Sequence, residues 1–289
     1  MGTFFHISRF HILCIAGLAS LCFGWLLTGS FLWAAPAVCT LDWFLVNLQN
    51  RIADLAEDRT NGVAGTDFVD RNTRALTIGS WLLLVGSFPV LHLLEPRLTW
   101  LRLGFQLIGL AYNYRLLPAP GGRTRFKETY FFKNTSSAAL FLISCLAYPS
   151  ALADWAVPLP RALWLAAFFF PLELTYEIIY DLRDVAGDRA ERVPTFPVVH
   201  GERTSHLIVE SLIALSAAAL IAGFTVGQLR VRELVLIAAP IQQLLFFELR
   251  VKRQVTQRDA VLLTYLGAAQ VLSYCCWVWA GLPLGPGEG

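Results

Sequence analysis

Three carboxylates follow the sixth long apolar run of the chain, at Asp181, Asp184 and Asp188. Asp184 and Asp188 are four residues apart, so a helix places them on one face, with Asp181 three residues earlier. Like charges this close repel one another unless solvent surrounds them or a cation neutralises them. Because hard divalent cations prefer oxygen ligands, this spacing indicates half of a metal site.

A matching set comes earlier in the chain, at the end of the second apolar run. Asn50, Asp54 and Asp58 repeat the four-residue spacing within NRIADLAED. A single acidic pair at i and i+4 is usually a solvated helix face. Two such sets, each where a helix would leave the membrane, instead predict one shared metal site.

The loop between the two sets supplies positive charge. Residues 112–134, YNYRLLPAPGGRTRFKETYFFKN, contain five basic residues and a PAPGG sequence that must break a helix. Mg²⁺ commonly binds through one or two carboxylates together with substrate phosphates. Two acidic helices with a basic loop between them therefore indicate a diphosphate site, in which basic side chains contact the remaining phosphate oxygens.

Such a site suits the ionisation of an allylic diphosphate. The metal and the basic groups stabilise charge on the leaving group, and a water-poor aromatic chamber holds the carbocation. The sequence has 20 Phe, 9 Trp and 8 Tyr with which to line a chamber of this kind. An apolar chamber within a membrane also suits a long prenyl tail.

The elements that must position these residues are membrane helices. Of the 289 residues, 56% are hydrophobic and 15% are charged, whereas a soluble domain has about 25% charged residues. The apolar blocks are long enough to span a bilayer, so we expect an all-α polytopic membrane protein, with one domain over residues 1–289. About nine transmembrane helices in a bundle around a central chamber are predicted, at residues 10–28, 31–49, 75–94, 98–117, 136–157, 160–180, 205–226, 231–248 and 261–282.

The basic residues predict the orientation in the membrane. Most of the 23 Lys and Arg residues lie near the N-terminus or after the even-numbered spans. The other side holds only Arg97, Arg102, Arg161, Arg230 and Arg232. We therefore place the N-terminus and both acidic sets on the cytoplasmic side. The net charge of +2 indicates no nucleic-acid partner, the six cysteines lack metal spacing, and no obligate protein partner is evident.

These motifs resemble the two signatures of the UbiA superfamily of intramembrane prenyltransferases. Asn50, Asp54 and Asp58 fit NxxxDxxxD, and Asp184 and Asp188 fit DxxxD within DLRDVAGDRAERVPTFPVVHG. The nine spans and the position of both motifs after even-numbered spans also match the family. The resemblance therefore covers nearly the whole chain.

The resemblance implies a Mg²⁺-dependent transferase that moves an isoprenyl group from its diphosphate to an acceptor, commonly an aromatic ring, and releases diphosphate. It implies that Asp54, Asp58, Asp184 and Asp188 are catalytic and that, with Asn50, they bind the metal. The residues implied for diphosphate binding are Asn50, Tyr112, Arg123, Arg125, Lys127, Lys133 and Asp181.

The chain departs from the family pattern in the basic loop. The family often has a lysine four residues after the tyrosine that corresponds to Tyr112, and this chain has Leu116 there. Which basic residue contacts phosphate therefore stays open.

Two more acidic residues lie deeper in the sixth span. Glu177 and Glu173 precede Asp181 by about one and two turns, and an acidic side chain at that depth is costly unless it faces a cavity or a partner. We interpret Glu177 as an acid or base that faces the acceptor, whereas for Glu173 a helix nearer the surface is an equal alternative. Tyr176 and Tyr180 continue the same acidic face, as lining of the prenyl pocket, as phosphate contacts or as ordinary interfacial tyrosines.

Two other functions remain open at this stage. A terpene cyclase of the same superfamily would use the same diphosphate site but fold the ionised chain onto itself, so that no acceptor is added. A transporter or non-catalytic scaffold can also carry paired acids near membrane exits. Against a transporter, the charges lie at one face, and the sequence shows no inverted repeat.

Overall fold

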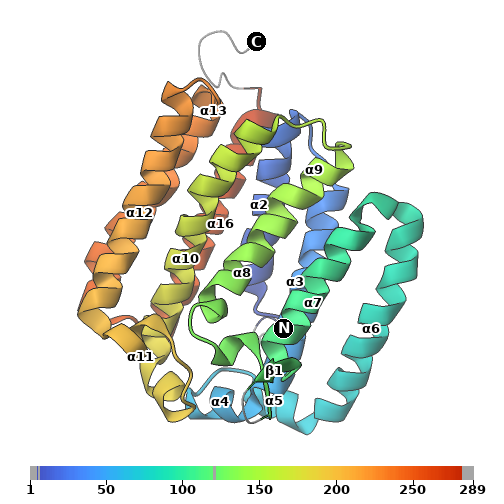
Figure 1. Ribbon diagram of the computed structural model, residues 1–289, viewed down its shortest axis with the longest axis vertical. Helices are drawn as coiled ribbons and strands as arrows, with labels where there is room; N and C mark the ends of the chain where they lie inside the picture. The colour runs from blue at the N-terminus through green and yellow to red at the C-terminus, as the bar shows by residue number, and fades with distance from the viewer. Residues whose placement is uncertain (1–4, 6, 120–121, 282–289) are drawn as a thin grey trace.

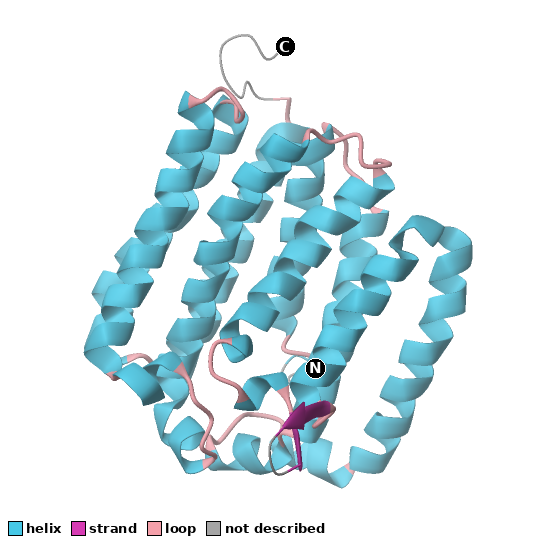
Figure 2. Cartoon of the chain, in the orientation of Figure 1, coloured by secondary structure: helices cyan, strands magenta, loops and turns pink. Residues whose placement is uncertain are grey.

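The computed structural model describes residues 5, 7–119 and 122–281, and long helices that run side by side make up most of it (Figure 1, Figure 2). The long helices are α2 (Phe10–Thr28), α3 (Ala34–Ala53), α6 (Thr73–Leu94), α7 (Thr99–Asn113), α8 (Phe132–Leu142), α10 (Leu159–Ala190), α12 (Glu202–Thr225), α14 (Ala238–Phe246) and α16 (Gln257–Trp279).

Short elements connect or extend these helices. The short α-helices are α4 (Leu55–Thr60), α5 (Thr66–Arg71), α9 (Tyr148–Leu152), α11 (Phe196–His200), α13 (Val231–Leu234) and α15 (Lys252–Gln254). The 3-10 turns are η1 (Pro96–Leu98), η2 (Phe126–Glu128) and η4 (Val235–Ile237), and the π-helical turns are η3 (Ile143–Ala147) and η5 (Phe247–Val251). The strands β1 (Leu117–Ala119) and β2 (Gly122–Thr124) form one antiparallel hairpin.

Each predicted span coincides with a helix or with consecutive helical segments, which confirms the all-α fold. Seven of them are long and apolar enough, by length and composition, to cross a membrane within the described residues. The helices α3 and α7 are not among these seven. The count of nine spans, the single domain and the cytoplasmic N-terminus therefore stay predictions.

Two helix boundaries differ from the predicted ones in ways that matter for the site. The helix α7 ends at Asn113, four residues earlier than expected, because the chain turns into the β1–β2 hairpin at Leu117. Residues 120 and 121 of the predicted PAPGG turn lie outside the described part of the chain. The helix α10 runs ten residues beyond its predicted span, to Ala190, so its three aspartates stay on one continuous helix.

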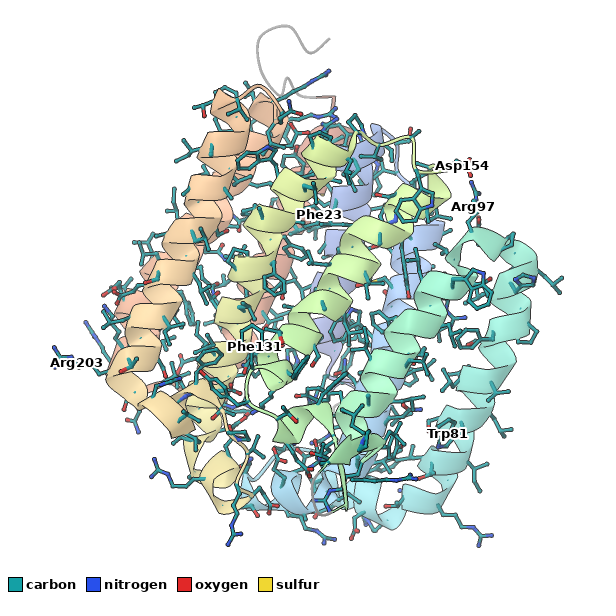
Figure 3. The ribbon with its side chains drawn as sticks, in the orientation of Figure 1. Phe23, Trp81, Arg97, Phe131, Asp154 and Arg203 are labelled. Carbon is teal, nitrogen blue, oxygen red and sulfur yellow. The ribbon has the colours of Figure 1, made fainter. Side chains whose placement is uncertain are left out.

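Aromatic side chains fill the interior of the bundle between α2, α3, α8 and α10. The rings of Phe23 and Phe169 have centroids 4.6 Å apart, and those of Trp43 and Phe141 are 4.3 Å apart. Phe23 lies inside the bundle in Figure 3. Such close ring contacts stabilise a core beyond the area that they bury, so this packing holds the four helices at fixed spacing.

A buried ion pair joins α3 to α7. Arg102 Nη2 donates to Asp42 Oδ1 at 2.7 Å, and Gln106 and Tyr148 donate to the same carboxylate at 2.9 and 2.8 Å. A buried charge is costly unless it is paired and hydrogen-bonded. This network explains how the two less apolar helices fit inside the bundle. Arg102, counted above among the basic residues of the non-cytoplasmic side, is a buried structural residue.

The short elements α4, α5, β1 and α11 gather at the lower end of the bundle in Figure 1. The paired side chains of Arg97 and Asp154, which are 3.2 Å apart, lie toward the upper end (Figure 3). Both acidic sets therefore belong to one end of the helix bundle, as the loop order predicts.

Candidate active site

A chamber of about 600 Å³ lies between α2, α3, α8, α10 and α16. Asp54 and Asp184, from the two acidic sets, both line it. Farther along the same helices its lining includes Trp43, Phe141 and Glu173. One cavity thus has a highly charged end and an aromatic end.

The first acidic set sits where α3 gives way to α4. Asn50 Nδ2 donates to Asp54 Oδ2 at 2.6 Å and to Asn113 Oδ1 of α7 at 3.1 Å. Asp58, one turn farther along, accepts a hydrogen bond of 2.5 Å from Arg51. All three side chains of the NxxxDxxxD motif are buried, and all three line the chamber.

The basic loop contacts this first set and α4. Arg125 Nη1 lies 2.7 Å from Asp54 Oδ1, and Lys127 Nζ lies 2.7 Å from Asp54 Oδ2. Lys127 also forms an ion pair with Glu57. Arg123, by contrast, is exposed on β2. The structure therefore brings two of the predicted loop cations to the acidic set and leaves Arg123 on the surface.

The first turn of α8 reaches the second acidic set. Lys133 Nζ lies 2.8 Å from Asp181 Oδ1 and 3.1 Å from Asp188 Oδ2. Asn134 Nδ2 donates to Asp181 Oδ2 at 2.7 Å. Lys133 therefore lies between two carboxylates of α10.

Asp184 has a partner on its own helix. Arg183 Nε donates to Asp184 Oδ1 at 2.7 Å, and the guanidinium lies 4.7 Å from the centroid of the Tyr180 ring. The Tyr180 hydroxyl is 2.9 Å from Thr264 Oγ1 of α16. Arg183, one of the basic residues that follow the sixth span, thus lies in the chamber lining.

The inner part of the chamber holds the remaining predicted residues. Tyr112, Tyr176 and Glu177 line it, and Glu177 accepts a hydrogen bond of 2.7 Å from Ser137 of α8. Glu173 also lines it and is buried. Glu173 thus faces a cavity inside the protein, and its depth in the membrane stays a prediction.

Burial and nearby basic groups act in opposite directions on the pKa of both aspartates in the first set, and the balance differs between them. Burial alone would raise the pKa of Asp54, but Lys127 and Arg125 outweigh it and hold that pKa below its ordinary value. Burial raises the pKa of Asp58, although Arg9 and Arg51 oppose the shift. Asp54 is therefore the more readily ionised of the two.

The donor set fits magnesium that is shared with a ligand. Asn50, Asp54, Asp58, Asp184 and Asp188 offer only oxygen donors of the kind that Mg²⁺ prefers. Among the described residues, no group of three His, Cys, Asp or Glu side chains is close enough to hold an ion alone. A site completed by phosphate oxygens agrees with the oxygen donors present and with the lack of a three-residue cluster in the described part of the chain. Mg²⁺ commonly binds through one or two carboxylates plus substrate phosphates.

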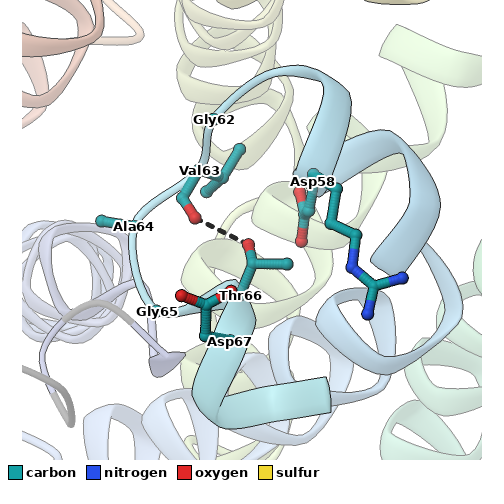
Figure 4. Close-up of a pocket in the computed structure, with 8 residues that line it drawn as sticks. Asp58, Gly62, Val63, Ala64, Gly65, Thr66 and Asp67 are labelled. Atoms are coloured by element: carbon teal, nitrogen blue, oxygen red, sulfur yellow. Dashed lines mark hydrogen bonds between the residues drawn. The ribbon is translucent and has the colours of Figure 1, made fainter.

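A second hollow of about 320 Å³ lies beside the first acidic set, over the α4–α5 loop (Figure 4). Asp58 lines both cavities. Thr66 Oγ1 donates to the Val63 carbonyl at 2.6 Å and closes the loop. Gly62 and Gly65 have φ values of 61° and 88°, a backbone region that favours glycine. This hollow belongs to the loop that supports Asp58.

Sequence reasoning missed several polar residues that line the chamber or contact its acidic sets. Asn134 and Ser137 follow Lys133 by one and four residues, so helical spacing from Lys133 was a usable signal for Ser137. Asn47 precedes Asn50 by less than one turn and faces the same chamber. No spacing rule indicated Asn113, which contacts the first set from a different helix.

Comparison with known proteins gives a family match over most of the chain. The sequence model of the UbiA prenyltransferase family matches residues 10–268. A digeranylgeranylglyceryl phosphate synthase from Methanothermobacter thermautotrophicus is 38% identical over 58 residues, which cover 20% of this chain. That match spans about a fifth of the synthase, 21% of its length.

Solved structures with the same fold come from archaeal UbiA homologues. A homologue from Archaeoglobus fulgidus, bound to DMAPP and Mg²⁺, has a TM-score of 0.71 and 16% identity, over 97% of this chain and 100% of that one. The apo homologue from Aeropyrum pernix has a TM-score of 0.62 and 20% identity, over 92% and 98% of the two chains. At these identities the likeness establishes the fold alone.

Proposed function

Because this chain belongs to the UbiA prenyltransferase family, we propose that it transfers an isoprenyl group from its diphosphate to an acceptor and releases diphosphate. The observation that carries the proposal is the single chamber lined by Asp54 and Asp184, with an aromatic wall behind them. A charged end suits a diphosphate and an aromatic end suits a prenyl chain.

Basic side chains from three places would hold the diphosphate. Arg125 and Lys127 come from the loop, Lys133 from α8 and Arg183 from α10, and all four now contact motif carboxylates. Charge-assisted hydrogen bonds from such groups to phosphate oxygens are strong. They would stabilise the negative charge that develops as the bond between C1 and the diphosphate oxygen breaks.

The carboxylates of both acidic sets would hold Mg²⁺ with the diphosphate. The metal would act as a Lewis acid on the phosphate oxygens. The fold neighbours from Archaeoglobus fulgidus that bind Mg²⁺ with DMAPP or GPP support this assignment. The side chains of Trp43, Phe141 and Tyr176 line the space inward of the carboxylates, where they would exclude water and face the developing cation.

The test is incubation of the purified, detergent-solubilised protein with radiolabelled geranyl or farnesyl diphosphate, with and without Mg²⁺, and with and without a hydroxyl-bearing acceptor such as 2-naphthol or 1-O-octylglycerol. Measurable diphosphate release that requires Mg²⁺ is the expected result. The prenyl product is then separated by chromatography and identified by mass. Tight binding of a prenyl diphosphate without any turnover would instead identify a non-catalytic scaffold.

The same experiment separates transfer from cyclisation. A cyclase gives a cyclic hydrocarbon or terpene alcohol when no acceptor is present, whereas a transferase needs one. The aromatic lining of the chamber suits both reactions, whereas the inner polar side chains described below favour an acceptor. We also propose that the site faces the cytoplasm, since most basic residues lie at the end of the bundle that holds it.

A further inference from the structure

The inner part of the chamber contains polar groups that the diphosphate site does not use. Asn47 of α3 is only 4% exposed, and its Nδ2 atom has no hydrogen-bond partner among the described residues. Glu173 of α10 is 5% exposed, and in the described part of the chain its carboxyl group forms no hydrogen bond or ion pair. Both side chains line the chamber.

Glu177 lies between these groups and the diphosphate level. It is about one turn, or about 6 Å, inward of Asp181 on α10, and Glu173 is one turn farther. Ser137 donates to Glu177 Oε1 at 2.7 Å, and this contact fixes the carboxyl group while its other oxygen stays available. Glu177 is partly exposed, and it lines the chamber.

Unpartnered polar groups in a buried cavity are costly to the folded protein. An amide or carboxyl group without a hydrogen bond loses its hydration and gains nothing in return. Within a membrane protein, acidic residues at such depth mark ligand pathways or pair with a partner. A prenyl chain offers no hydrogen-bonding group, so it cannot satisfy Asn47 or Glu173.

We propose that Asn47, Glu173 and Glu177 form the acceptor subsite, that they bind a hydroxyl group of the acceptor, and that Glu177 accepts its proton. This inference rests on the proposed prenyl transfer. Asn47 donates to the hydroxyl oxygen, and a carboxylate accepts from the hydroxyl hydrogen. The position of Glu177 one turn from Asp181 suits this role, because the reacting C1 is bonded directly to the diphosphate.

Prenyl transfer to a hydroxyl-bearing acceptor breaks two bonds, O–H and C1–O, and forms two, one to Glu177 and one to C1. The O–H bond breaks and its proton passes to Glu177, which becomes the neutral acid. The acceptor anion supplies the electron pair for the new bond to C1. The bond between C1 and the diphosphate oxygen breaks, and its electron pair leaves with the diphosphate.

Binding of matched probes tests the subsite without knowledge of the natural acceptor. The wild-type protein, loaded with Mg²⁺ and farnesyl S-thiolodiphosphate, is titrated with 2-naphthol and with 2-methoxynaphthalene. A second pair is 1-O-octylglycerol and its dimethyl ether. In at least one pair the hydroxyl compound should bind about tenfold more tightly than the ether, as a hydrogen bond to a charged group allows. Equal affinities within both pairs would overturn the proposal.

Two variants then test whether Glu177 and Asn47 cause the tighter binding of the hydroxyl probe. Glu177→Leu and Asn47→Leu should each remove the preference for the hydroxyl probe, whereas Glu248→Gln on the exposed side of η5 should keep it. Retained binding of the thiolodiphosphate shows that a variant is folded. A preference that survives in both leucine variants would contradict the assignment.

Turnover of the preferred probe separates a proton acceptor from a structural residue. Glu177→Gln should lower transfer by about 10²-fold or more, while slow release of prenyl alcohol from the diphosphate continues. Glu177→Asp should restore part of the transfer. Transfer by Glu177→Gln at the wild-type rate would refute the proton-acceptor role. Absence of thiolodiphosphate binding in the wild type would instead contradict the proposed function itself.

Discussion

Lys133 Nζ lies 2.8 Å from Asp181 Oδ1, which links the first turn of α8 to the acidic face of α10. The same ammonium group is 3.1 Å from Asp188, and both partners line the chamber. A lysine held between two carboxylates beside a cavity is already positioned to contact an anionic ligand there.

Replacement of Lys133 by methionine should weaken binding of farnesyl S-thiolodiphosphate with Mg²⁺ by about tenfold or more. The reason is the loss of a charge-assisted hydrogen bond to phosphate. Calorimetric titration measures the effect. Lys252→Met is the matched control, because Lys252 lies on α15 outside the chamber lining; equal affinities in the two variants would exclude a phosphate contact by Lys133.

In the basic loop, Arg125 offers a test variant and Arg123 offers its matched control. Arg125 contacts Asp54, whereas Arg123 is exposed on β2. Arg125→Ala should therefore raise the KM for the prenyl diphosphate by about tenfold, and Arg123→Ala should change it less than twofold. Initial rates of diphosphate release give both KM values. A larger increase in KM for Arg123→Ala than for Arg125→Ala would show that the loop changes its contacts when substrate binds.

The ion pair between Asp42 and Arg102 predicts an asymmetric effect on stability. Arg102→Leu alone should lower the free energy of unfolding by about 3–5 kcal/mol, because it leaves Asp42 buried without its partner. The double replacement Asp42→Leu with Arg102→Leu should recover much of the loss. Thermal unfolding in detergent measures both, with Arg97→Ala at the surface as a control. A double variant no more stable than the single one would argue against charge burial as the cause.

Magnesium should stabilise the protein mainly together with the diphosphate. Each motif aspartate that lines the chamber already has a basic partner in the described structure, so phosphate oxygens must supply part of the metal's ligands. Millimolar Mg²⁺ alone should move the melting temperature little, and Mg²⁺ with farnesyl S-thiolodiphosphate should raise it by several degrees through mass action. Chelation with EDTA should reverse the shift. A full shift with Mg²⁺ alone would indicate a metal site made by the protein only.

The sequence predicted the helices well because membrane spans are a strong local signal. Apolar blocks and helix-breaking residues mark each span, and the four-residue spacing of Asp54 and Asp58, and of Asp184 and Asp188, is visible without any structure. The length of α10 was harder to predict. Charged residues follow Tyr180 and end the apolar run, yet the backbone continues as helix to Ala190, since no proline intervenes before Pro194.

Contacts between distant segments could not be read from the sequence. Nothing local distinguishes Arg125, which reaches Asp54, from Arg123, which does not. Similarly, the sequence indicated Arg102 only as a basic residue that predicts orientation, because its buried partner Asp42 lies sixty residues away. Glu173 remained ambiguous for the same reason, because only the packing of α10 against α8 and α2 decides whether it faces a cavity.

The two acidic sets are expected to form one site, and a double-mutant cycle on ligand binding tests this most directly. The affinity of farnesyl S-thiolodiphosphate with Mg²⁺ is measured for the wild type, Asp54→Asn, Asp184→Asn and the double variant, with Asp154→Asn at the opposite end as the control. One shared site predicts that each single variant weakens binding at least tenfold and that the double variant loses much less than the product of the two effects. Wild-type affinity in either single variant, or losses that simply multiply, would contradict a shared site.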